Sequence, residues 1–224
     1  MNNNMNQNAS EELSKNALKS GTTILGIVCK DGVVVASDRQ STAGNIVMNK
    51  DSEKTILING YLAISGTGMV SDIKMTEKVL SAELRLKELR SKVRPTVKEG
   101  ANLLANLLYR GIRQSGTMAG FLMGGYNDDG TCELYSIEPA GSVKKIEDFD
   151  ANFGSGMPFV LGLLERQYKK GISMKEGVEL ALEAIKSSTQ RDIGSGYGID
   201  VFSITKDGIK QVVKQRIDPK YEND

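Results

Sequence analysis

The chain has 224 residues, with 29 lysines and arginines against 28 aspartates and glutamates, and it contains no histidine. The resulting net charge of +1 provides no electrostatic footprint for nucleic acid or for an anionic membrane, so we expect neither as a partner. The absence of histidine excludes serine–histidine and cysteine–histidine catalysis, and the zinc hydrolases that depend on histidine ligands. The length fits one α/β domain.

The first residues, "MNNNMNQNASEELSKNALKSG", are polar and include no apolar segment of the kind that a secretory signal needs. No run in the chain approaches the length of a membrane span, so we expect a soluble, cytoplasmic protein. The asparagine-rich composition of residues 1–9 favours disorder, and a removable propeptide is the alternative. Cys29 and Cys132 lie far apart in strand-like runs, which predicts buried, reduced thiols.

Runs of β-branched residues predict two hairpins near the start of the chain. Residues 22–37 form two such runs around Lys30-Asp31-Gly32, and "KTILI" and "YLAIS" flank Asn59-Gly60. We expect these four strands to form one opening sheet. Two later strand pairs have the same character, at 118–126 with 132–138 and at 199–205 with 209–216.

Four helices are predicted between these strand pairs, at residues 71–91, 96–114, 158–170 and 173–191. Two of them begin with capping boxes, formed by Thr96 with Glu99 and by Ser173 with Glu176. The order ββββ, αα, ββ, αα, ββ favours an α+β sandwich in which two antiparallel sheets pack together and helices cover both outer faces. It excludes a doubly wound parallel sheet.

Three glycine-bearing segments are candidates for binding an anion: "SGTGMVSD", "FGSGMP" and "DIGSGYG". None fits the dinucleotide pattern GxGxxG after a strand, and no P-loop tripeptide is present, so we expect no cofactor and no metal. Two of the segments run into predicted helices, where backbone amides stabilise a developing negative charge. Taken alone, each is more often a plain turn.

Thr22 opens the first predicted strand, and a threonine in a strand is usually structural. The interpretation changes if Thr22 is a chain terminus. A free α-amino group has a pKa near neutrality and lies within reach of the residue's own hydroxyl, so nucleophile and base belong to one residue. Such chemistry hydrolyses an amide without histidine.

Several segments in register carry a family resemblance: Gly21-Thr22-Thr23, the strand pair ending "ASD", Lys54, "SGTG", "FGSG" and "QRDIGSG". From Gly21 to about Gly208 the chain resembles an archaeal-type catalytic β subunit of the 20S proteasome, in the N-terminal nucleophile hydrolase family. The resemblance implies a four-layer αββα fold and a threonine endopeptidase that degrades unfolded polypeptides. It implies partners too: proteasome α subunits and other β subunits in stacked seven-membered rings, and an ATP-dependent unfoldase.

The resemblance also implies a division of the chain. Residues 1–21 match a propeptide that is removed autocatalytically by cleavage between Gly21 and Thr22, and residues 22–224 form a single domain. The implied catalytic residues are Thr22, Asp38, Lys54, Ser155, Asp192 and Ser195. The amide of Gly68 matches the oxyanion donor. The implied substrate pocket is lined by Ser41, Thr42, Ser52, Gly66, Val70 and Lys74.

The physical chemistry of the central roles is consistent with the resemblance. A desolvated ammonium on Lys54 beside Thr22 favours the alkoxide and keeps the neighbouring amine neutral. Asp38 holds Lys54 in place and compensates its burial. From spacing alone, an ordinary salt bridge between adjacent strands explains the pair as well.

The resemblance places Gly66 at the floor of the pocket, where the missing side chain predicts a deep pocket and a preference for bulky residues. Glu53 and Lys74 have opposite charges, so neither sign is expected to be selected. Gln40, Thr67 and Met157 depart from the family's usual residues. These departures motivate an alternative, a non-catalytic structural β subunit of the same ring. A small-ligand-binding α/β domain is a third, poorer alternative.

Overall fold

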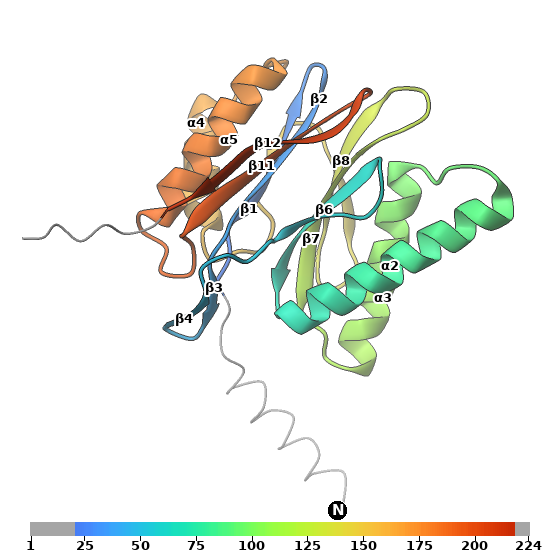
Figure 1. The fold of residues 1–224 in the computed structure, drawn as a ribbon, viewed down its shortest axis with the longest axis horizontal. Coiled ribbons are helices and arrows are strands. Elements are labelled where there is room, and N and C mark those ends of the chain that lie inside the picture. The colour runs from blue at the N-terminus through green and yellow to red at the C-terminus, as the bar shows by residue number, and fades with distance from the viewer. Residues whose placement is uncertain (1–20, 218–224) are drawn as a thin grey trace, which may run out of the picture.

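Two five-stranded antiparallel sheets pack face to face, and a pair of helices covers the outer face of each (Figure 1). This α+β four-layer sandwich is the predicted fold class. The computed structural model describes residues 21–217, so the predicted propeptide lies outside the described residues except for Gly21. In sheet order, the first sheet consists of β10 (Phe149–Asp150), β1 (Ile24–Cys29), β2 (Gly32–Asp38), β11 (Gly198–Thr205) and β12 (Gly208–Arg216).

The second sheet also has five strands. In sheet order, they are β5 (Thr55–Leu57), β6 (Leu62–Gly68), β7 (Ala119–Tyr126), β8 (Cys132–Ile137) and β9 (Val143–Ile146). A separate two-stranded hairpin, β3 (Ser41–Ala43) with β4 (Ile46–Asn49), connects the first sheet to the second. Sequence analysis did not identify β3, β4, β9 or β10, which are all four residues or shorter.

The predicted four-stranded opening sheet is wrong. Both hairpins form, but β1 and β2 belong to the first sheet whereas β5 and β6 belong to the second. The reason lies in the pairing of β2, whose free edge is taken by β11 from Ile199 opposite Asp38 to Ile204 opposite Val33. The second hairpin therefore has no edge of β2 to join, and the β3–β4 segment moves the chain to the other layer.

The helices match the four predicted ones, with bounds α2 (Val70–Ser91), α3 (Val97–Gln114), α4 (Met157–Gln167) and α5 (Met174–Thr189). Both predicted capping boxes form: Thr96 accepts from the amide of Glu99, and Ser173 accepts from the amide of Glu176. In each box the glutamate side chain binds the cap residue's backbone in return. Among the described residues, no helix is long and apolar enough to cross a membrane.

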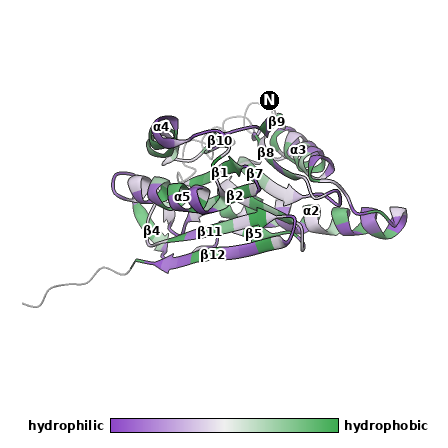
Figure 2. Cartoon of the chain, turned by 90° about the horizontal axis from the view of Figure 1, so that it is seen from above, coloured by the Kyte–Doolittle hydropathy of each residue, from purple (hydrophilic) through white to green (hydrophobic). Residues whose placement is uncertain are grey.

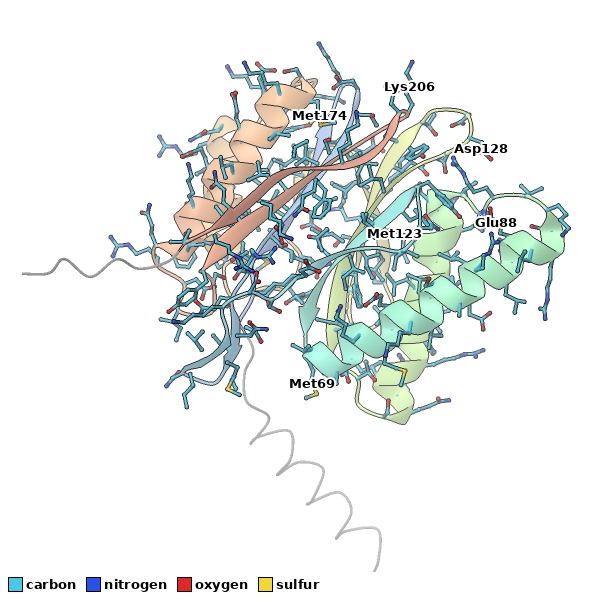
Figure 3. All side chains as sticks on the ribbon, viewed as in Figure 1. Met69, Glu88, Met123, Asp128, Met174 and Lys206 are labelled. Atoms are coloured by element: carbon cyan, nitrogen blue, oxygen red, sulfur yellow. The ribbon has the colours of Figure 1, made fainter. Side chains whose placement is uncertain are left out.

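Apolar side chains fill three layers, one between the sheets and one under each helix pair. The layer between the sheets consists of Val33, Val35, Ala63, Leu134, Ile146 and Ile204. Figure 2 shows the apolar colour concentrated inside and the outermost strand, β12, mostly hydrophilic. In Figure 3, Met123 lies inside the sandwich, whereas Met69 and Met174 lie at opposite ends of the molecule, at the starts of α2 and α5.

Both cysteines are unpaired, as expected of reduced thiols. Cys29 is buried, as predicted, but Cys132 is only partly buried. Burial raises the pKa of the Cys29 thiol to about 12 and also raises the pKa of Cys132. Neither thiol is therefore ionised near neutral pH, which excludes both as ready nucleophiles.

Replacing Ser173 tests the capping box of α5. Ser173→Ala removes the hydroxyl that accepts from the amide of Glu176, and we expect it to lower the free energy of unfolding by about 1 kcal/mol in urea denaturation. Ser173→Asp restores an acceptor at the same place and should recover most of the loss. Equal destabilisation by the two variants would show that the cap is not the cause.

Candidate active site

Thr22, Asp38 and Lys54 meet in a buried cluster at one end of the sandwich. Thr22 lies two residues before β1, Asp38 ends β2, and Lys54 directly precedes β5. The Nζ atom of Lys54 lies 3.2 Å from Oγ1 of Thr22 and 2.6 Å from Oδ1 of Asp38. All three side chains are buried, so water screens their interactions weakly.

The Asp38 carboxylate is held by four donors. Besides Lys54, the amide of Thr23 donates to Oδ1 at 2.8 Å, and the amides of Gln40 and Gly196 donate to Oδ2 at 2.9 and 3.0 Å. Such a set of donors stabilises a charged carboxylate in a buried site. Asp38 thereby fixes the position of Lys54 and compensates part of the free energy needed to bury its charge.

The environment of Lys54 perturbs its ammonium. Burial lowers the pKa of Lys54, and the neighbouring Asp38 carboxylate opposes that shift. The ammonium also lies 3.4 Å from the carbonyl oxygen of Gly21. A cation in this place stabilises negative charge that develops on Thr22 Oγ1 or on the carbonyl oxygen of the preceding residue.

Ser155, Asp192 and Ser195 form a second group on the other side of Thr22. The backbone nitrogen of Thr22 donates to Ser155 Oγ at 3.1 Å, and Ser155 Oγ donates to Asp192 Oδ2 at 2.7 Å. Ser195 Oγ donates to the same carboxylate oxygen at 2.6 Å and lies 2.7 Å from Oγ1 of Thr23. The structure thus brings all six sequence-predicted catalytic residues into one connected set.

The peptide bond before Thr22 lies against the threonine's own hydroxyl. Thr22 Oγ1 donates to the carbonyl oxygen of Gly21 at 2.6 Å. The amide of Gly21 donates to Thr42 Oγ1 at 2.7 Å, so Thr42 holds the backbone on the N-terminal side of this bond. Thr42 is not among the residues that line the cavity described below, although sequence analysis predicted it as a pocket residue.

Glycines allow the surrounding loops to approach Thr22 and Thr23. A Cβ atom on Gly21 would lie 2.1 Å from Cα of Gly194, and one on Gly156 would lie 1.7 Å from Oγ1 of Thr23. Both distances are far below any van der Waals contact. Both positions therefore require glycine. The backbone of Gly194 occupies the space beside Gly21, and the packed hydroxyl of Thr23 occupies the space beside Gly156.

Gly68 ends β6 beside the cluster and has a φ of +117°, which side chains rarely adopt. A Cβ atom there would also lie 2.1 Å from the carbonyl oxygen of Met118. Gly68 and Thr22 share a cavity of about 40 Å³. Its lining residues are Thr22, Ser41, Ser52, Glu53, Lys54, Gly66, Gly68, Val70, Ile73 and Lys74.

The predicted deep pocket at Gly66 is wrong. A Cβ atom on Gly66 would lie 2.8 Å from Cγ2 of Ile73 and 2.9 Å from Cε1 of Phe121, so side chains from α2 and β7 already fill the space that the glycine leaves. Sequence analysis did not identify Ile73 as a site residue. Its only sequence signal is an apolar residue in the first turn of a predicted helix, which indicates packing in general but no particular neighbour.

Comparison with known proteins shows the family. A family model described as "Proteasome subunit" matches residues 18–204. The chain belongs to the proteasome subunit family. A proteasome subunit beta 1 of Thermococcus kodakarensis is 44% identical over 191 residues, which cover 85% of this chain and 92% of that protein. The proteasome subunit beta of Nanoarchaeum equitans is 41% identical over 191 residues, with 85% and 96% covered.

The proteasome subunit beta 1 of Thermococcus gammatolerans is 43% identical over 199 residues, which cover 89% of this chain and 96% of that protein. The resemblance to archaeal proteasome β subunits is therefore confirmed, and with it the N-terminal nucleophile hydrolase fold that the family implies. The described residues contain no cluster of three or more side chains suited to a metal ion.

Thr67 and Gln40, which both differ from the usual family residues, make hydrogen bonds that connect loops of the site to its strands. Thr67 Oγ1 donates to the carbonyl oxygen of Phe153 at 2.5 Å, which ties β6 to the loop carrying Ser155. The side-chain amide of Gln40 donates to the carbonyl oxygen of Ile193 at 2.6 Å, which ties the end of β2 to the loop of Asp192 and Ser195. Neither departure therefore leaves a polar side chain unpaired.

Arg39 is a buried residue of this proteasome subunit that sequence analysis did not assign to the site. It forms ion pairs with Asp200 of β11 and with Asp51. Its carbonyl oxygen also accepts from the amide of Ser52 at 2.8 Å. These contacts fix the segment that leads into Lys54, so Arg39 supports the position of the lysine through the backbone.

Removing either member of the buried ion pair tests how the site is held. We expect Asp38→Ala to lower the free energy of unfolding by about 3–5 kcal/mol, because it leaves the Lys54 charge and three backbone amides without their acceptor. Lys54→Met should cost less, because Asp38 keeps its three amide donors. Denaturant unfolding of the purified chains measures both, and equal losses would contradict this account of Asp38.

Proposed function

We propose that the chain is a catalytic β subunit of the 20S proteasome, a threonine-type endopeptidase with Thr22 as its nucleophile. The observation that carries the proposal is the buried contact of Lys54 Nζ with Thr22 Oγ1 at 3.2 Å, backed by Asp38 at 2.6 Å. The ammonium thus contacts the hydroxyl of the expected nucleophile at the wall of the cavity, which an ion pair that only joined the two strands would not require. The family membership is consistent with this chemistry.

The proposed reaction begins once Thr22 is the first residue. Its free amine takes the proton of its own hydroxyl as Oγ1 forms a bond with the carbonyl carbon of the substrate. The amide of Gly68 donates to the resulting oxyanion. The amine returns the proton to the leaving nitrogen as the peptide bond breaks, which leaves an ester on Thr22. Water then hydrolyses the ester, and the hydroxyl is restored.

Within this scheme the neighbouring residues act on protons and charge. The Lys54 ammonium stabilises the negative charge of the attacking oxygen and disfavours protonation of the adjacent amine. Ser155 connects the Thr22 nitrogen to Asp192, and Ser195 shares the same carboxylate oxygen. Because these hydrogen bonds join the Thr22 nitrogen to a carboxylate, they hold the amine toward the hydroxyl from which it takes the proton.

Removal of the leader uses the same threonine. The contact of Thr22 Oγ1 with the Gly21 carbonyl at 2.6 Å supports attack on that carbonyl carbon. The Gly21–Thr22 bond breaks as the ester forms, and the hydroxyl proton ends on the released amine. Water hydrolyses the ester, which frees the carboxylate of Gly21. Residues 1–21 are thus a propeptide, and residues 22–224 form the mature domain.

We further propose that the subunit works in the cytoplasm, in stacked seven-membered rings with α-type and other β-type subunits, fed with unfolded polypeptide by an ATP-dependent unfoldase. Large apolar side chains that are more than half exposed support a need for covering subunits. They are Ile46, Met48, Leu57, Met75, Val93, Met118, Phe153 and Ile193.

The second candidate is a structural β subunit that assembles but is never processed. The departures at Gln40, Thr67 and Met157 motivate it. The hydrogen bonds of Gln40 and Thr67 weigh against it, because both hold loops of the candidate site in contact with its strands. Met157 begins α4 and packs against the core under that helix.

Removal of residues 1–21 distinguishes the catalytic subunit from the structural subunit. Intact-mass analysis of the assembled protein should find Thr22 as the first residue. Thr22→Ala should retain the leader and hydrolyse no peptide, because it lacks the hydroxyl, whereas Thr22→Ser should retain activity. An assembled wild-type particle with a wholly retained leader would contradict the catalytic proposal and leave the structural subunit.

Thr67 should act as a positioning residue for Ser155. Thr67→Val keeps the branched shape but removes the hydroxyl that binds Phe153, and we expect it to lower kcat about five- to tenfold with little change in KM. Thr67→Ser retains the hydroxyl and should restore kcat. Steady-state kinetics on the processed particle provide the measurement. A Thr67→Val variant with lowered stability but unchanged kcat would show a merely structural role.

A further inference from the structure

The loop that carries Ser155 contains a residue in an unfavourable backbone conformation. Asn152 is buried and has a φ of +43°, in the left-handed region that residues other than glycine rarely adopt. Asparagine tolerates this region better than most residues, but glycine adopts it without strain. Because glycine would satisfy the backbone, the side chain of Asn152 must contribute something that the backbone alone does not.

The side-chain amide of Asn152 connects the loop to the second sheet. Its Nδ2 atom donates to the carbonyl oxygens of Phe121 and Ile137 at 2.8 and 3.4 Å. Nδ2 also donates to Ser136 Oγ at 3.0 Å. Phe121 lies in β7, whereas Ser136 and Ile137 lie in β8. The loop itself leaves β10 of the first sheet, so the amide joins the first sheet to two strands of the second.

The oxygen of the same amide is also in use. Asn152 Oδ1 accepts from the amide of Phe153 at 2.6 Å. A Cβ atom on Gly120 of β7 would lie 2.6 Å from Oδ1, so the strand has room for the amide only because glycine is present there. Gly120 pairs with Thr67 of β6, whose hydroxyl binds the carbonyl oxygen of Phe153. Three strands of the second sheet therefore hold residues 152 and 153.

The residues that follow enclose the backbone of Thr22. The amide of Gly156 donates to the Thr22 carbonyl oxygen at 3.3 Å, and a Cβ atom on Gly154 would lie 2.3 Å from the same oxygen. Between them, Ser155 Oγ accepts from the Thr22 nitrogen at 3.1 Å. A shift of this loop would therefore move the hydroxyl that holds the Thr22 nitrogen.

We propose that Asn152 is a positioning residue, which fixes Ser155 against the Thr22 nitrogen by anchoring its loop to β7 and β8. The proposal rests on the proposed peptidase function, in which Ser155 holds the amine toward the hydroxyl of Thr22. The hydrogen bonds of the Asn152 amide offset the strain of its left-handed backbone. Asn152 thus acts on the reaction through Ser155.

Steady-state hydrolysis of a fluorogenic peptide by the assembled, processed protein tests the anchor. Asn152→Gly keeps the backbone conformation without strain but removes the amide. We expect it to lower kcat about tenfold and to change KM less than about twofold. An unchanged kcat would overturn the proposal.

Ser136→Ala is the matched control. It removes one acceptor of the Asn152 amide, but the carbonyl oxygens of Phe121 and Ile137 still accept its two hydrogens. It should keep kcat within about twofold of the wild type. A loss of kcat as large as that of Asn152→Gly would overturn the proposal, because any change of packing at this place would then have the same effect.

Gly120→Ala perturbs the same amide from the opposite strand. Its Cβ atom would displace Oδ1 of Asn152, so kcat should fall although the sequence of the loop is unchanged. This variant keeps the test available if Asn152→Gly does not fold. A folded Gly120→Ala variant with the kcat of the wild type would contradict the proposal.

A double-mutant cycle shows whether Asn152 acts through Ser155. In the Ser155→Ala background, Asn152→Gly should lower kcat less than about twofold, because the hydroxyl that it positions is already absent. If Asn152→Gly lowers kcat as strongly in this background as in the wild type, the effect is a general loosening of the site and the proposal fails.

Hydrogen–deuterium exchange separates the anchor from the peptidase function. Mass spectrometry of the assembled protein follows the amides of residues 153–157, which include that of Gly156. Asn152→Gly should accelerate their exchange at least about tenfold, whereas Ser136→Ala should not. If exchange responds in this way although the wild type hydrolyses no peptide, the anchor is as proposed and the peptidase function fails. If exchange does not respond, the role of Asn152 is overturned whatever the activity.

Discussion

The buried ion pair between Asp38 and Lys54 joins the two sheets of the sandwich. Asp38 ends β2 in the first sheet, and Lys54 precedes β5 in the second. Burying two charges is unfavourable unless hydrogen bonds satisfy them, and here three backbone amides and the Thr22 hydroxyl complete the set. The position of Thr22 therefore depends on how the two sheets are packed.

Hydroxyl groups continue this contact into the core beside the pair. Ser37 Oγ lies 3.0 Å from Thr55 Oγ1, which in turn lies 2.7 Å from Ser65 Oγ. Each of these residues follows or precedes a site residue by one or two positions. Polar contacts between the layers have few alternative arrangements because each unpaired partner would be buried, so they fix the register of one sheet on the other.

The sequence was sufficient to predict the elements that depend on neighbouring residues, but it was not sufficient to predict how distant segments pack. The capping boxes of α3 and α5 depend on residues three apart, and the turns at Asn59-Gly60 and Lys30-Asp31-Gly32 depend on a few neighbours, so these elements were predicted correctly. The sheet that each hairpin joins depends on the pairing of β2 with β11, which lies near the other end of the chain, and that prediction was wrong.

The candidate site divides in the same way. The cluster of Thr22, Asp38 and Lys54 was expected from a family resemblance, which short motifs around each of these residues carry. The depth of the cavity was mispredicted because the volume left by Gly66 is filled by Ile73, and no local pattern relates the two residues. Gln40 and Thr67 were noted as departures, but only the coordinates give them partners.

The division of the site between two sheets has a consequence for a protein of this kind during its synthesis. A partly synthesised chain already contains Thr22 and Asp38, which flank its first hairpin, but Lys54 and Gly68 reach them only when the second sheet packs on the first. The candidate site is therefore incomplete until both sheets have formed and packed together. Under the proposed function, nascent and misfolded copies of the chain are unable to hydrolyse a peptide bond.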